Sequence, residues 1–156
     1  MVLKEKYEKR YDWARLAMLL TIAFTVGNMV VSVIDPNWTV AFSASLPEML
    51  FSIIIAVVTT DGPLYLVILC AAAVLLLLTA FVLCWIFSKR HPGWMVTFLV
   101  IFLVDTVAMI ALMVTAFLSK EATPDLWNIL LRAIFQIAVL YFTITGLVAR
   151  KKRYKK

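Results

Sequence analysis

Four long apolar runs, separated by short polar turns, dominate the pattern of hydrophobic and polar positions along the chain. They cover about residues 13–34, 64–88, 94–118 and 126–148. Each is long enough to supply the roughly 20 apolar residues that cross the hydrocarbon core of a bilayer. The pattern predicts an all-α fold: a polytopic integral membrane four-helix bundle, with residues 1–156 forming a single transmembrane domain.

A fifth apolar segment, at about residues 47–60, lies between the first two long runs. Its roughly 13 apolar positions fall below the usual spanning length, and the turn sequence Asp61-Gly62-Pro63 ends it. We therefore expect an additional short helix. The pattern leaves open whether this helix lies on the outer surface, re-enters the membrane or completes a proline-kinked span that begins at Trp38.

Composition and charge agree with this interpretation. The chain is 64% hydrophobic, well above a typical soluble domain. Four spans with both termini in the cytoplasm place thirteen Lys and Arg residues inside and only Lys120 outside, whereas five spans would place eight inside and six outside. The positive-inside rule favours four spans. The basic tail, residues 149–156, is expected to meet anionic lipid headgroups and not nucleic acid.

Polar and small residues recur at helical spacing on the first, third and last long runs. Residues three and four apart share one face of a helix. In lipid, small and polar residues mark the face that packs against other helices, because they permit close approach and interhelical hydrogen bonds. The stripes include Thr21, Thr25 and Asn28 in the first run, Asp105 and Ala108 in the third, and Arg132, Gln136, Thr143 and Gly146 in the last.

Asp105 lies close to the middle of the third run, where a charge costs at least about 2.5 kcal/mol and requires a partner. At about 1.5 Å per residue, Thr25, Asp105 and Gln136 lie roughly 16–18 Å from the inner interface. Asn28 and Arg132 lie about one helical turn further out. We therefore predict one intramembrane polar cluster made of Asp105, Arg132, Gln136, Asn28 and Thr25.

Three interpretations of this cluster stay open. Asp105 and Arg132 neutralise each other and lock the helices in register, as buried ion pairs do. Alternatively, the cluster is a proton- or ion-linked site or a polar cavity for a small ligand. In the third interpretation, Asp105 faces lipid and pairs with another subunit or with a different protein. Glu48 is a candidate gate or second partner, because it competes for Arg132 if the short segment re-enters the membrane.

The motifs of catalysis and cofactor binding are missing from the sequence. His91 is the single histidine, and no set of His, Cys and carboxylate residues has the spacing of a zinc or iron site. The four glycines are scattered and form no phosphate-binding loop, and there is no Gly-x-Ser-x-Gly motif. We therefore predict a protein that is not an enzyme, with no catalytic, metal-binding or cofactor-binding residues and no cofactor.

Three stretches resemble a group of known proteins. WTVAFSASLPEML (38–50), the core of the third run around Asp105 and YFTITGLVARKK (141–152) are similar to uncharacterised small four-helix integral membrane proteins of Gram-positive bacteria. The resemblance extends over most of the chain. It implies a bacterial plasma-membrane location and contributes no activity and no site residues.

Two functions follow from these observations. The first is a non-enzymatic accessory or self-associating helical bundle, which acts as a homo-oligomer or with another membrane protein. The alternative is a small channel or transporter-like protein that moves a proton or a small cation through the polar cluster around Asp105.

Overall fold

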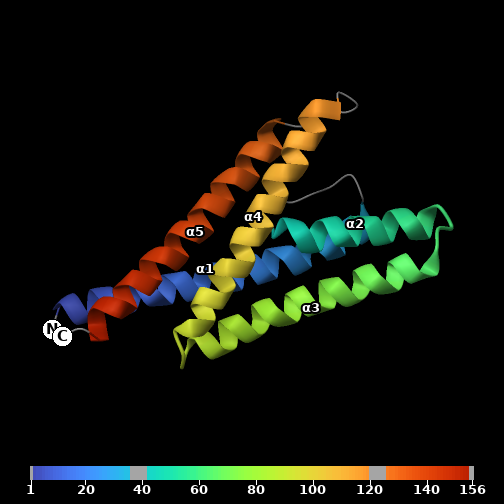
Figure 1. Cartoon of the computed structure of the whole chain (residues 1–156). Coiled ribbons are helices and arrows are strands. Elements are labelled where there is room, and N and C mark those ends of the chain that lie inside the picture. Colours follow the sequence, from blue (N-terminus) through green and yellow to red (C-terminus); the bar gives the residue numbers. More distant parts are fainter. Residues whose placement is uncertain (1, 36–41, 120–125, 155–156) are drawn as a thin grey trace.

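The structure is a computed structural model that describes residues 2–35, 42–119 and 126–154. The described residues form five helices: α1 (Val2–Ile34), α2 (Ser45–Thr59), α3 (Leu64–Ser88), α4 (Gly93–Ser119) and α5 (Leu126–Tyr154) (Figure 1). The all-α prediction is confirmed. Lys120, which four spans place outside, and Trp38, at which the proline-kinked span would begin, lie outside the described residues.

Four of the helices are long and apolar enough to cross a bilayer. The candidate spans are Tyr7–Ile34, Leu64–Ser88, Gly93–Thr115 and Trp127–Lys151. α2, with 15 residues, is apolar but shorter. Its last turn leads into Asp61, which has a φ of 50°, a conformation that Asp tolerates better than most residues. The amide of Gly62 then bonds to the carbonyl of Val57, so the helix stops there and α3 begins after Pro63.

The helices form a bundle in which α1 packs along α5, α3 contacts α1, α2 and α4, and α4 contacts α2 and α5. The first turns of α1 and the last turns of α5 lie at the same end of the bundle, where the α3–α4 turn also lies (Figure 1). We call this the terminal end. α2 runs from the middle of the bundle towards the opposite end, where α3 begins (Figure 1).

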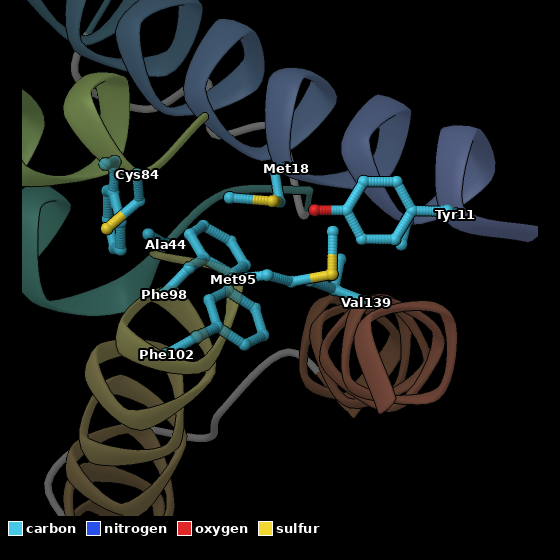
Figure 2. Close-up of a cluster of buried hydrophobic side chains, with 10 residues drawn as sticks. Tyr11, Met18, Ala44, Cys84, Met95, Phe98, Phe102 and Val139 are labelled. Atoms are coloured by element: carbon cyan, nitrogen blue, oxygen red, sulfur yellow. The ribbon is translucent and has the colours of Figure 1, made fainter. Parts of the chain in front are cut away.

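The apolar core lies between the terminal end and the start of α2. Met18 of α1, Met95, Phe98 and Phe102 of α4, and Val139 of α5 meet there, each at most 3% exposed (Figure 2). The rings of Phe98 and Phe102 stack with centroids 5.6 Å apart. The same cluster includes Ala44, the residue that precedes α2. The short helix therefore begins directly against this apolar layer.

The outside of the bundle is covered with large apolar side chains. Leu69 and Leu76 of α3, Val107 of α4 and Ile137 of α5 are each more than 60% exposed. Many polar side chains, by contrast, are buried between the helices. An apolar surface of this extent is unusual in a soluble monomer, whereas lipid tails solvate it well. Together with the four candidate spans, this distribution indicates a multi-pass membrane protein.

Candidate functional site

The start of α2 is capped by side chains from other helices. The first backbone N–H groups of any α-helix have no partner within that helix. Ala44, at the N-cap position, has extended backbone and no side-chain cap. Its amide donates to Thr25 Oγ1 on α1 at 2.9 Å. The next two amides, of Ser45 and Leu46, donate to Asp105 on α4.

Asp105 uses both oxygens of its carboxylate in this arrangement. Oδ2 accepts from the Ser45 amide at 3.0 Å, and Oδ1 accepts from the Leu46 amide at 2.6 Å. The side chain of Gln136, on α5, donates to Oδ2 at 3.0 Å. Hydrogen bonds to an ionised acceptor are stronger than neutral ones, and the helix N-terminus carries partial positive charge. Asp105 is 1% exposed, so the carboxylate is enclosed by these donors.

Arg132 pairs with Glu48, and not with Asp105 as one of our interpretations held. Arg132 Nη2 lies 2.6 Å from Glu48 Oε1. The physical reason is the position of α2, which comes between the two expected partners. It satisfies Asp105 with its own amides and offers Arg132 an acid from its own first turn. Glu48 thus takes the role of the second partner named from the sequence.

The other oxygen of Glu48 connects this ion pair to α1. Glu48 Oε2 accepts from Ser43 Oγ at 2.6 Å, and Ser43 Oγ in turn accepts from the side-chain amide of Asn28 at 3.0 Å. The chain Asn28–Ser43–Glu48–Arg132 therefore ties α1, α2 and α5 together. Both Ser43 and Asn28 are 1% exposed.

Gln136 closes the network on the α4–α5 side. Besides Asp105, its amide nitrogen reaches Ser45 Oγ at 3.4 Å, and its carbonyl oxygen accepts from the hydroxyl of Thr106. The six residues named from the sequence, Thr25, Asn28, Glu48, Asp105, Arg132 and Gln136, thus all lie around the first turn of α2. We call these six, together with Ser43, Ser45 and Thr106, the α2 anchor network.

Ser43, Ser45 and Thr106 were missed from the sequence. A signal for Ser45 exists in the stretch Ser45-Leu46-Pro47-Glu48, which has the Ser-x-x-Glu spacing of a helix start with Pro in its first turn. That pattern locates a helix N-terminus. It does not reveal that α4 supplies the cap, because Asp105 is 60 positions away in sequence from Ser45.

The α2 anchor network leaves no buried polar atom without a partner. Among the described residues, every buried side-chain nitrogen or oxygen has a hydrogen-bond partner. Towards the terminal end, Thr21 and Thr143 bond to carbonyls of their own helices, those of Ala17 and Val139. The apolar layer of Met18, Phe98 and Phe102 fills the space between. The polar contacts of the network thus do not continue to the terminal end.

Metal binding has no evident place in this arrangement. Within residues 2–35, 42–119 and 126–154, no group of three or more His, Cys, Asp or Glu side chains is close enough to hold an ion. The two acids of the network, Asp105 and Glu48, are engaged by donors from α2, from α5 and from Ser43, which precedes α2. In this geometry the two carboxylates hold α2 in place.

Comparisons of the chain with protein-family models, with curated proteins and with solved structures gave no match. The chain is therefore assigned to no family. The resemblance to small four-helix membrane proteins of Gram-positive bacteria stays a prediction.

Proposed function

We propose that this chain is a non-enzymatic protein of the plasma membrane that acts as an accessory or self-associating helical bundle. The observation that carries the proposal is that, among the described residues, every buried side-chain nitrogen or oxygen has a partner within the chain. Ionisable residues within membrane spans either pair inside the bundle or mark paths for substrates and ions. Here each acid is bound by groups of the chain itself, which favours a structural role.

In the proposed topology, α1, α3, α4 and α5 cross the membrane and both termini lie in the cytoplasm. α2 is then a re-entrant half-helix. Its N-terminus lies near mid-membrane, beside Asp105 and Thr25, and its C-terminus returns to the outer side. Non-helical backbone at that depth requires protein partners for its polar groups. The bonds from Ala44, Ser45 and Leu46 meet this requirement.

Association is tested with the full chain in two ways. Native mass spectrometry after extraction in mild detergent should give a defined oligomer or a stoichiometric complex with another membrane protein. Energy transfer between two labelled populations of the chain in liposomes should persist on dilution with lipid if the chain associates with itself. A monomer in detergent, without energy transfer in liposomes, contradicts the proposal.

The second candidate is movement of a proton or small cation. It is favoured by two carboxylates, Asp105 and Glu48, which lie in one hydrogen-bonded network in the middle of the bundle. The apolar layer beside Ala44 weighs against it. Flux into liposomes that carry the wild type or Asp105→Asn distinguishes the two functions. Flux that Asp105→Asn abolishes supports transport, and equal or absent flux in both contradicts it.

A further inference from the structure

An apolar groove opens on the surface of the bundle at the terminal end, between the start of α4 and the end of α5. Its volume is about 490 Å³, which lies within the range of small-molecule sites. Gly93 and Val96 line it on the α4 side and Leu147 and Val148 on the α5 side. Arg150 and Lys151 also line it, so basic groups lie beside the apolar walls.

The groove is open at Gly93. A Cβ atom built on this residue meets no heavy atom within 4 Å, and Val96, one turn further along α4, is 47% exposed. The groove is thus not filled by the described side chains.

Arg150 is held in place next to the groove. Its Nη1 and Nη2 atoms donate to the carbonyls of Ser88 and Arg90 at 3.3 Å each, and its guanidinium carbon lies 4.4 Å from the centre of the Tyr11 ring. These partners are neutral, and the guanidinium has five N–H donors in total. Among the described residues, neither Arg150 nor Lys151 forms an ion pair with a carboxylate. The positive charge of both is therefore available to an anion.

We propose that this groove binds an acyl chain of an anionic phospholipid whose phosphate is held by Arg150 and Lys151. Charge complementarity selects this occupant, since the walls are apolar and both charged lining residues are basic. The planar guanidinium of Arg donates two hydrogen bonds at once to the oxygens of a phosphate. The pocket on the α1 side of Arg150 suits an anion less, because the acids Glu8 and Asp12 line it.

The inference rests on the membrane location proposed above, which places this end of the bundle at a headgroup layer. Basic side chains next to a spanning segment attract anionic lipids, by about a fivefold change in affinity for each residue. The groove gives this general attraction a defined place. It also predicts that shape, as well as charge, contributes to retention of the lipid.

The test is native mass spectrometry of the full chain in detergent with added phosphatidylglycerol or phosphatidylcholine that have identical acyl chains. We expect the wild type to retain phosphatidylglycerol in preference. Lys151→Gln should weaken phosphatidylglycerol binding about fivefold and phosphatidylcholine binding less, because the choline cation offsets the charge of the phosphate. Gly93→Leu should fill the groove and weaken both lipids. Gly27→Leu is the matched control, because a Cβ there also meets nothing within 4 Å and Gly27 is not part of the groove.

Equal retention of the two lipids by the wild type overturns the proposal, as does unchanged retention in both groove variants. A lipid-free dimer that Gly93→Leu disrupts overturns it too, because a second copy of the chain then covers the groove. Circular dichroism checks the fold of Gly93→Leu. Lys151 is exposed, so Lys151→Gln keeps the test decisive. Recovery of the wild type in the soluble fraction contradicts the membrane location instead.

Discussion

Asp105 acts in this structure as a cap for a helix other than its own. A carboxylate within a span needs donors around it, and here the donors are two free amides at the start of α2 and the side chain of Gln136. The need is mutual, since those amides lie in the bundle interior, where water does not satisfy them. The acid and the short helix therefore stabilise each other.

Removal of the Asp105 carboxylate should strongly destabilise the bundle. Asp105→Ala leaves the Ser45 and Leu46 amides without acceptors, and each such buried group costs about 1–3 kcal/mol. Asp105→Asn keeps one acceptor oxygen and should lose less. Asp61→Asn is the control, because Asp61 is exposed and Asn also tolerates its positive φ. The unfolding free energy measured in bicelles should be lowest for Asp105→Ala, higher for Asp105→Asn, and close to the wild-type value for Asp61→Asn. Equal stability of Asp105→Ala and the wild type contradicts the capping role.

The Arg132–Glu48 ion pair should appear in a double-mutant cycle. Residues in direct contact have interaction energies of about 0.5–3 kcal/mol. Arg132→Ala and Glu48→Ala should each destabilise, and the double variant should lose less than their sum, because neither charge is then left buried alone. The same cycle on Arg132 and Asp105, which form no ion pair, should give a smaller coupling. A larger coupling for that second pair contradicts the arrangement.

At the scale of elements, α1 and α5 approach closely through small residues. A Cβ atom built on Gly146 lies only 2.5 Å from the Cβ of Ala14. A side chain with a Cβ atom at position 146 would therefore force one helix to move. Glycine at this position therefore determines how closely the two helices pack, as small residues do between helices in lipid.

Exchange of the two small residues tests this contact. Gly146→Ala should destabilise by about 1–3 kcal/mol, because overpacked interiors must shift. The double variant Ala14→Gly/Gly146→Ala restores the total volume and should recover part of the loss. Gly27→Ala serves as the control, since it has open space and should be neutral or slightly stabilising. Thermal unfolding of the wild type and the three variants in detergent measures the effect, and no recovery in the double variant argues against a direct contact.

At the scale of the whole molecule, the proposed topology places the α2–α3 turn and the terminal end on opposite sides of the membrane. In intact cells, a membrane-impermeant maleimide should label Asp61→Cys and should label Lys151→Cys only after permeabilisation. The native Cys70 and Cys84 are buried and serve as an unlabelled background. Labelling of both variants from outside contradicts four spans with cytoplasmic termini.

The sequence by itself determined the helices and the positions of the polar residues along them. Four apolar runs and the short run at 47–60 are local properties, because length and hydropathy decide which segments suit a bilayer. Helical rise placed Thr25, Asp105 and Gln136 at one depth before any contact was known. The acid at mid-span was recognisable from the sequence for the same reason.

The tertiary structure alone decided which groups these residues bind. Asp105 and Arg132 are complementary and similar in depth, so a sequence argument joins them. The folded chain inserts α2 between them, and its free amides and Glu48 satisfy each residue separately. The Ser-x-x-Glu spacing marks the start of α2, but it does not show which side chains of other helices accept from the backbone N–H groups there. Packing therefore decided which groups Asp105 and Arg132 bind, while residue type and spacing indicated only which residues could take part.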